Sequence, residues 1–221
     1  MLGSSPSKAV SAAMHYLKDP DAIYARSFAI IGEEVDLSGL AAPLRPLALR
    51  LIHACGMTDI LPDLRFAEAV VPAVRDALGR GRPLLVDCEM LKAAITARQL
   101  PPATDVICTL NHKPAAERGR RLGITRSAAA VALWEPHLDG AVVCIGNAPT
   151  ALFALLELVD SGAPKPAAIV AFPVGFVGAA EAKAELAANP RGLPFATLLG
   201  RRGGSAMAAA AINAIFAERS S

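Results

Sequence analysis

The chain has 221 residues, of which 53% are hydrophobic and 19% are charged, and its formal net charge is +2. This length and apolar content suffice for one domain with a hydrophobic core on both faces of a β-sheet. So small a net charge excludes the broad basic surface of a nucleic-acid-binding protein, although local arginine clusters can still bind anions.

The first residues carry no structural signal. Residues 1–12 are rich in Ser, Ala and Lys and contain no apolar stretch of the kind found in secretory signals. We interpret residues 1–14 as a flexible N-terminal extension and residues 15–221 as a single domain. The sequence Asp19-Pro20-Asp21 then marks the start of a first helix, which carries Tyr24, Arg26 and Ser27.

A second helix is expected from about Pro46, and it ends at Gly56. Leu44, Leu47 and Leu51 recur at helical spacing and predict one buried stripe, while His53 lies off that stripe in the last turn. The negative end of the helix dipole favours the protonated imidazole and hence a proton donor. From these residues alone, a histidine that only caps exposed carbonyls is the favoured interpretation.

A third helix is expected over residues 66–78, and we see no strand before residue 83. Beyond that point, short apolar runs alternate with helical segments. The predicted strands are 84–87, 106–110, 141–145, 167–172 and 195–199. The predicted helices between and after them are 89–98, 115–122, 126–134, 150–159, 179–188 and 206–217. This alternation indicates a three-layer α/β fold, a doubly wound parallel sheet of five strands with extra N-terminal helices.

Ligands of open α/β sheets bind beyond the carboxyl ends of the strands. The loops at those ends are 87–90, 111–112, 146–150, 173–178 and 200–205. Three of these loops contain glycine and open into helices, and such turns aim backbone N–H groups at anions. Thr125 and Ser205 are expected as N-caps. For Asp87 and Glu89, a helix N-terminal charge and a contact with ligand are equally consistent with the sequence.

Arginines near these loops strengthen the expectation of an anionic ligand. Arg26, Arg126, Arg201 and Arg202 could each hold a carboxylate through two parallel hydrogen bonds, although a solvated surface charge is the commoner role of a single arginine. Neither G-x-G-x-x-G nor G-x-x-x-x-G-K-[ST] occurs, which disfavours nucleotide binding.

The cysteines and the longest apolar run exclude several protein classes. No C-x-x-C pair exists among Cys55, Cys88, Cys108 and Cys144, which argues against a zinc site and a disulfide framework. We interpret these residues as reduced thiols of a cytoplasmic protein, a reactive thiol being the alternative. The apolar run 167–180 is interrupted by proline and glycine and is shorter than the roughly 18 residues of a spanning helix. We therefore expect no metal and no membrane segment.

Six segments can be read together in chain order. They are 22–28 (AIYARSF), 52–56 (IHACG), 124–127 (ITRS), 146–153 (GNAPTALF), 173–181 (PVGFVGAAE) and 200–205 (GRRGGS). From about Tyr16 to Phe216, and in the same order along the chain, these segments resemble the precorrin-8X methylmutase family of cobalamin biosynthesis. The resemblance implies a flavodoxin-like fold, a homodimer, and an isomerase that moves a methyl group from carbon 11 to carbon 12 of a corrinoid ring without any cofactor.

The resemblance also implies roles for individual residues. His53 matches the catalytic histidine of the family, and Ser27 is expected to donate a hydrogen bond to the substrate. The substrate is a tetrapyrrole polycarboxylate, so its binding requires cations around an apolar disc. The residues expected to bind it are Tyr24, Arg26, Ser27, Met90, Arg126, Ser127, Asn147, Gly175, Phe176, Arg201, Arg202 and Ser205.

Three other functions remain open at this point. A cobalt-precorrin-8 methylmutase would perform the same rearrangement on a cobalt-containing ring. A corrinoid-binding carrier would hold the ring without changing it. An FMN-binding protein of flavodoxin type is disfavoured by the arginine-rich loops.

Overall fold

The computed structural model describes residues 14–102 and 104–217, so the extension expected for residues 1–14 lies outside the described residues except at Met14. Across the described ranges, six strands form one sheet in the order β1-β6-β5-β4-β2-β3. The strands are β1 (Leu64–Phe66), β2 (Leu84–Val86), β3 (Val106–Cys108), β4 (Val142–Ile145), β5 (Ala168–Ala171) and β6 (Phe195–Leu198).

Strands β2 to β6 are parallel and correspond to the five strands expected from the sequence. Counted from β2, their order across the sheet is 2-1-3-4-5. The sheet nevertheless has six strands, so the predicted five-stranded sheet is wrong in its strand count. β1 pairs antiparallel with β6, with Leu64 opposite Leu198. Its three residues are too few to show alternation, and its position depends on a partner more than 130 residues away.

The helices follow the predicted order. They are α1 (Pro20–Glu34), α2 (Arg45–Cys55), α3 (Val70–Gly79), α4 (Glu89–Ala94), α5 (Lys113–Leu122), α6 (Arg126–Val131), α7 (Pro149–Asp160), α8 (Ala179–Ala188) and α9 (Ser205–Phe216). Short 3₁₀ segments are η1 (Ala42–Leu44), η2 (Thr58–Asp63), η3 (Ala97–Gln99) and η4 (Ala132–His137). Three predicted helix boundaries are wrong by three or four residues. The helix expected from residue 66 begins at Val70, and the helices expected to reach residues 98 and 134 stop at Ala94 and Val131.

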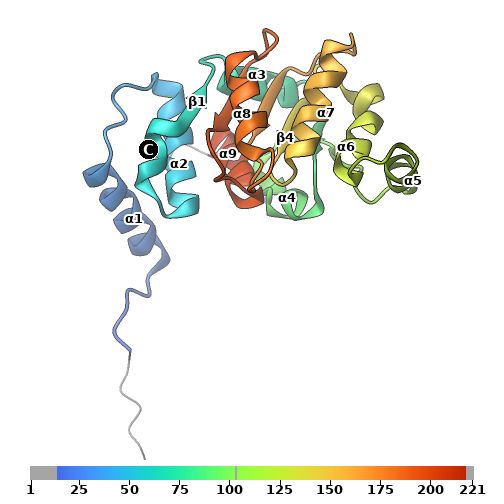
Figure 1. Cartoon of the computed structure of the whole chain (residues 1–221). Coiled ribbons are helices and arrows are strands. Elements are labelled where there is room, and N and C mark those ends of the chain that lie inside the picture. The colour runs from blue at the N-terminus through green and yellow to red at the C-terminus, as the bar shows by residue number, and fades with distance from the viewer. Residues whose placement is uncertain (1–13, 103, 218–221) are drawn as a thin grey trace, which may run out of the picture.

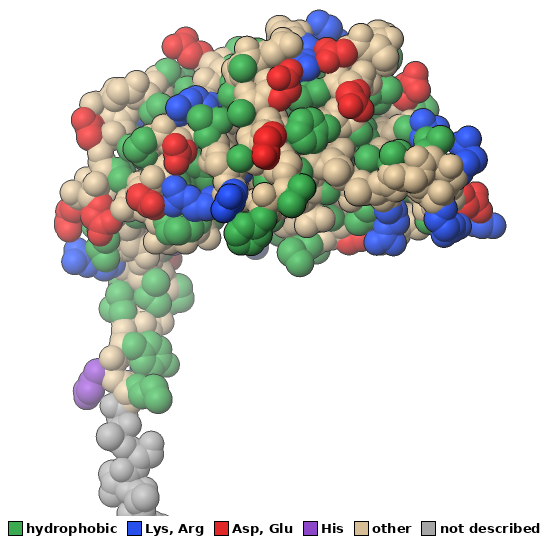
Figure 2. All heavy atoms as spheres, in the orientation of Figure 1, with side chains coloured by type: hydrophobic (Ala, Val, Ile, Leu, Met, Phe, Trp, Pro, Cys, Tyr) green, Lys and Arg blue, Asp and Glu red, His purple; other side chains and the backbone are tan. Residues whose placement is uncertain are grey.

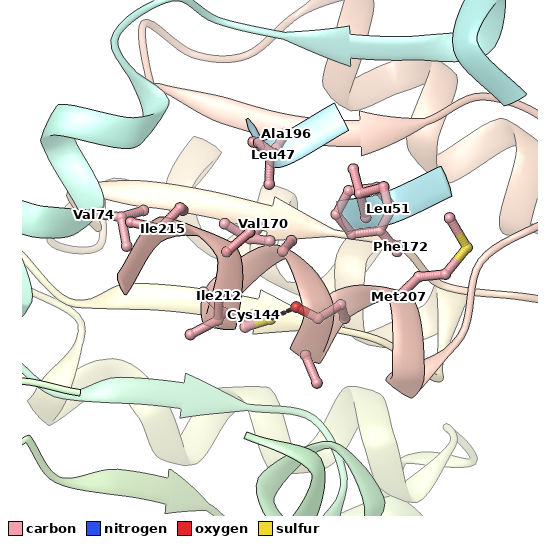
Figure 3. Close-up of a cluster of buried hydrophobic side chains, with 14 of the residues drawn as sticks. Leu47, Leu51, Val74, Cys144, Val170, Phe172, Ala196, Met207, Ile212 and Ile215 are labelled. Carbon is pink, nitrogen blue, oxygen red and sulfur yellow. Dashed lines mark hydrogen bonds between the residues drawn. The ribbon is translucent and has the colours of Figure 1, made fainter. Parts of the chain in front are cut away.

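Two hydrophobic cores lie on opposite faces of the sheet, so the three-layer arrangement is confirmed. One core contains buried residues of α2, α3, α4 and α9, and the other contains buried residues of α6, α7 and α8. Figure 3 shows how Leu47 and Leu51 of α2, Phe172 beyond β5, and Ile212 of α9 meet in the first core. The Cys144 thiol donates to the carbonyl of Ala208 in the same region, at 3.6 Å.

Helix α1 lies at one end of the molecule, outside α2 (Figure 1). Its N-cap Asp19 accepts a hydrogen bond from the Ala22 amide at 2.7 Å, as the Asp-Pro-Asp sequence indicates. Ile31 is the buried residue of this helix. Hydrophobic side chains cover much of the segment that leads into α1 (Figure 2). Among the described residues, no helix has the length and apolar content needed to cross a membrane.

Candidate active site

His53 lies in the last turn of α2, where the sequence places it. Leu47 and Leu51 of the same helix are buried, and His53 is exposed on a neighbouring face. Gly56 ends the helix in the left-handed conformation, with φ 67° and its amide bonded to the Ile52 carbonyl. Within residues 14–102 and 104–217, neither ring nitrogen of His53 has a hydrogen-bond partner. The imidazole is therefore available to a ligand.

Aromatic side chains of α1 hold the His53 ring. Phe28 stacks on it, with ring centroids 5.0 Å apart and an interplanar angle of 25°, and Tyr24 meets it edge-on at 5.8 Å. The guanidinium carbon of Arg50 lies 4.9 Å from the Tyr24 ring centroid and 5.3 Å from that of Phe28. Residues four apart on α1 and three apart on α2 share a helix face. Phe28 lies four residues after Tyr24, and Arg50 lies three residues before His53, so the helical spacing alone could have indicated both residues.

Two adjoining cavities open beside this cluster. His53, Arg50, Thr96 and Asn213 are among the residues that line the smaller cavity, of about 210 Å³. Tyr24, Phe28 and Arg50 line part of the larger one, of about 470 Å³. Arg50, Ala214 and Ala217 belong to both linings. A ligand over His53 would therefore meet both α2 and the C-terminal part of α9.

The other α1 residues expected at the site differ in position. The Ser27 hydroxyl donates to the Ile23 carbonyl at 3.0 Å, so its donor is used within the helix and only its lone pairs face outward. Arg26 follows Tyr24 by two positions, which is about 200° around the helix. It forms an exposed ion pair with Glu33 at 3.6 Å. The structure thus brings Tyr24, but not Arg26, against His53.

Asp87 organises the loop after β4. Its buried carboxylate accepts hydrogen bonds from the amides of Gly146, Asn147 and Ala148, at 2.9, 2.9 and 2.8 Å. Burial raises the pKa of Asp87, and the three amide donors oppose that increase. The glycine turn does bind an anion, as expected, but the anion is this side chain. Asp87 is therefore an internal anchor for the loop that carries Asn147.

Further loop amides are also bonded inside the protein. The Gly175 amide donates to the Arg201 carbonyl at 3.2 Å, and the Gly204 amide donates to the Phe172 carbonyl at 2.7 Å. A Cβ at Gly203 would lie 2.3 Å from the Phe172 carbonyl oxygen. Glycine has no Cβ and therefore allows the two backbone segments to approach this closely. The amides of Gly146, Gly175 and Gly204 are thus already bonded within the protein. Binding of substrate carboxylates by the turn amides stays a prediction.

Exposed apolar side chains and one arginine follow the carboxyl ends of the strands. Phe176 is 84% exposed and Met90 is 72% exposed. The guanidinium carbon of Arg201 lies 5.3 Å from the Phe176 ring centroid. Within the described ranges, Arg201 forms no ion pair. Exposed apolar surface beside such a cation suits a flat ligand with acidic substituents.

Arg202 differs from Arg201, because it bonds to acids of the η2 segment. Its guanidinium contacts Asp59 at 2.8 Å and Asp63 at 3.5 Å. It also lies 3.9 Å from the sulfur of Met57, four residues after His53. Behind it, the fully buried Lys183 of α8 donates to the Arg202 carbonyl, and burial lowers the pKa of Lys183 to about 8. Arg202 therefore connects the loop after β6 to the end of the helix that carries His53.

Ser205 is not the N-cap of α9, because Gly204 occupies that position. Ser205 is the first residue of the helix, is buried, and has its hydroxyl 3.3 Å from the Cys88 thiol. Cys88, Cys108 and Cys144 are all buried, as expected, and burial raises the pKa of Cys108 to about 11. Ser205 thus contributes to packing between α4 and α9.

Arg126 and Ser127 begin α6, and Thr125 caps that helix by accepting from the Ala128 amide at 3.1 Å, as predicted. The Thr125 and Thr150 hydroxyls lie 2.8 Å apart, which joins the starts of α6 and α7. Thr125 and Thr150 line a cavity of about 630 Å³. Its lining has no residue in common with the two cavities near His53. The expected binding residues therefore occupy separate regions of the described chain.

The sequence model of the family described as precorrin-8X methylmutase matches residues 22–218. Precorrin-8X methylmutase of Pseudomonas aeruginosa is 55% identical over 204 residues, covering 92% of this chain and 98% of that protein. The Sinorhizobium sp. protein of the same name is 51% identical over 200 residues, covering 90% and 95%.

More distant relatives have a different name. Cobalt-precorrin-8 methylmutase of Salmonella typhimurium is 36% identical over 213 residues, covering 92% of this chain and 97% of that protein. Among solved structures, precorrin-8X methylmutase from Thermus thermophilus matches with a TM-score of 0.78 and 35% identity, covering 89% of this chain and 94% of that one. From the extent and degree of these matches, the chain belongs to the precorrin-8X methylmutase family.

Proposed function

We propose that this protein is a precorrin-8X methylmutase, an isomerase of cobalamin biosynthesis that moves a methyl group from carbon 11 to carbon 12 of precorrin-8X and yields hydrogenobyrinic acid. The observation that carries the proposal is 55% identity, over 98% of its length, to an enzyme of that name. The exposed His53 ring, fixed against Phe28 beside an open cavity, supports it from the geometry. The proposed reaction requires no cofactor.

We favour the metal-free ring over the cobalt-containing ring as substrate. The Pseudomonas aeruginosa and Sinorhizobium sp. relatives named precorrin-8X methylmutase are 55% and 51% identical to this chain, whereas six relatives named cobalt-precorrin-8 methylmutase are 29% to 36% identical. The Thermus thermophilus structure named precorrin-8X methylmutase is 35% identical, so the preference rests on the first two relatives. Turnover of each ring by the purified protein, measured at equal concentrations, tests this choice. Faster turnover of the cobalt-containing ring would reverse it.

In the proposed mechanism, His53 is the catalytic residue. The methyl group migrates across one face of the conjugated ring: its bond to carbon 11 breaks as its bond to carbon 12 forms, and the double bonds shift accordingly. A protonated His53 donates a hydrogen bond to the ring and draws electron density away from the migrating centre. The stacked Phe28 ring fixes the direction of the donor.

The ring lies over an open surface beside His53 in this proposal. Tyr24 and Ser27 contact it from α1, and Met90 contacts it from the start of α4. Phe176 and Arg201 contact it from the loops after β5 and β6. Arg26, Arg126, Ser127 and Asn147 remain substrate contacts that the family resemblance implies, although Arg126 and Ser127 lie in a region of the chain separate from His53. Gly175, Arg202 and Ser205 take a positioning role, because their polar groups are bonded within the protein.

Substitution of His53 tests the assignment. We expect His53→Ala to lower kcat by about 10²–10⁴ with little change in affinity for the product, which is the range lost with a general acid. His137→Ala removes an exposed histidine elsewhere and serves as the control. The assay follows the absorbance change from substrate to product. Native turnover by His53→Ala would refute the mechanism, and a bound ring that the unaltered protein never converts would indicate a carrier.

We also propose that the protein acts as a cytoplasmic homodimer built from a single flavodoxin-like domain over residues 15–221. The strand order 2-1-3-4-5 supports the fold description, and four free cysteines suit a reducing compartment. Ile23 and Ile30 of α1 are 43% and 38% exposed, as expected of a surface that a second copy covers. Sedimentation analysis should show a dimer that Ile23→Asp weakens, with Ile124→Asp, equally exposed, as control. A monomeric unaltered protein would contradict this.

A further inference from the structure

The cavity of about 470 Å³ beside His53 has apolar walls and two arginines. Pro43, Pro46 and Val71 contribute to the walls, Arg50 enters from α2 and Arg75 enters from α3. Neither arginine was selected from the sequence, and the proposed mechanism does not use either. Arg50 is half-buried and Arg75 is exposed, so both cations lie at the edge of the cavity, where an anion can reach them.

Both guanidinium groups are held in place by neutral partners. Arg50 is half-buried over the rings of Tyr24 and Phe28. The Arg75 Nε donates to the Ile215 carbonyl at 2.8 Å, which orients the side chain and leaves its two terminal nitrogens for another acceptor. Within residues 14–102 and 104–217, neither arginine pairs with an acid, whereas Arg26, Arg80, Arg82, Arg191 and Arg202 all do.

We propose that Arg50 and Arg75 together bind one carboxylate side chain of the tetrapyrrole substrate and thereby set the rotation of the ring over His53. This inference rests on the proposed function and adds a specific anchor to it. Arg50 precedes His53 by three positions on α2, so their Cβ atoms are about 5–6 Å apart. That separation is comparable with the reach of a propionate substituent. A carboxylate held by Arg50 therefore brings the adjoining ring edge to the imidazole.

The pair should distinguish a carboxylate from a neutral group. Guanidinium groups form paired, charge-assisted hydrogen bonds with carboxylates, and the apolar walls strengthen them by excluding water. An ester or amide at the same position would leave both cations without a counter-charge. Because the guanidinium groups are already oriented, little conformational entropy is lost when the carboxylate binds.

Product binding tests this inference independently of catalysis. The probes are hydrogenobyrinic acid and a set of its derivatives, each with one carboxylate blocked as a methyl ester, titrated by absorbance. We expect Arg50→Gln and Arg75→Gln each to raise the Kd of the unblocked product by about 10–100-fold, the effect of losing a hydrogen bond to a charged group. Arg50→Lys should recover part of that loss. Arg120→Gln, on the distant helix α5, should change the Kd less than about twofold (Figure 1).

The decisive comparison combines a blocked carboxylate with a substituted arginine. One of the esters should raise the Kd of the unaltered protein by a similar factor. The same ester should not raise the Kd of Arg50→Gln any further, because the ester and the substitution remove the same interaction. If every ester raises the Kd by the same factor in the variants as in the unaltered protein, Arg50 and Arg75 bind no carboxylate of the ring, and the inference is wrong. Unchanged affinity in both variants would also overturn it.

One competing occupant can be identified by the same variants. Glu218 follows Ala217, a lining residue of this cavity, in the sequence. If Arg50→Gln and Glu218→Gln lower the free energy of unfolding non-additively while leaving product affinity unchanged, the arginines serve the chain's own carboxylate and the inference is wrong. Failure of the unaltered protein to convert precorrin-8X would instead refute the proposed function, since product binding does not depend on turnover.

Discussion

Substitution of Asp87 should destabilise the fold and disturb the loop that carries Asn147. The carboxylate is only 3% exposed and accepts three amide hydrogen bonds from residues 146–148. Asp87→Asn keeps one oxygen acceptor but turns an NH₂ group toward at least one of these donors. A buried donor left without an acceptor costs about 1–3 kcal/mol. We therefore expect a loss of about 1–3 kcal/mol, or roughly 2–12 °C in Tm for a domain of this size.

The pH dependence of that loss has a definite sign. Burial raises the pKa of Asp87 in the folded protein, so between its ordinary value and the raised value the folded state binds more protons than the unfolded state. The stability that Asp87 contributes is then fully present below the ordinary pKa and declines as the pH rises through the raised pKa. The difference between the unaltered protein and Asp87→Asn should shrink over that interval and be constant above it.

Denaturant unfolding, repeated at several pH values from acid to neutral, measures both effects. Asp105→Asn is the control, because Asp105 is an exposed aspartate just before β3. A loss of stability no larger than that of the control would refute the role of Asp87 as a buried anchor. The difference in free energy of unfolding between the unaltered protein and Asp87→Asn could instead grow as the pH rises through the ordinary pKa. In that case the amide donors would outweigh burial, and our assignment of burial as the dominant effect would be wrong.

Two further substitutions give separate predictions. Burial lowers the pKa of Lys183 from its usual value of 10.5 to about 8. The stability of the unaltered protein relative to Lys183→Met should therefore rise between those pH values, by about 3 kcal/mol. Parallel stability curves over that interval, measured by denaturant unfolding, would contradict this. Gly203→Ala should lower the free energy of unfolding by about 3 kcal/mol or more, because its Cβ would overlap the Phe172 carbonyl. Gly32→Ala in α1, where a Cβ meets no atom within 4 Å, should instead stabilise by about 0.5–1 kcal/mol, and equal thermal shifts for the two variants would refute the steric explanation.

Features that depend on near neighbours in the chain could be read from the sequence. The parallel strands β2 to β6 were expected because apolar runs of four to six residues, bounded by glycine, proline or a polar residue, favour buried strands. The end of α2 and the exposed position of His53 follow from the spacing of its leucines and from Gly56. Family resemblance, and not periodicity, pointed to a catalytic role for that histidine.

Features that depend on distant partners were decided only by the tertiary structure. β1 exists because it pairs with β6, and its own three residues carry too little pattern to reveal it. Arg201 and Arg202 are adjacent in the sequence, yet one stacks on Phe176 and the other pairs with Asp59, 143 residues away. Local sequence determines which side chains carry charge and which face of a helix they share. Which groups neutralise those charges depends on how the chain packs, and that packing leaves Arg50 and Arg75 at one cavity, without an ion pair to an acid among the described residues.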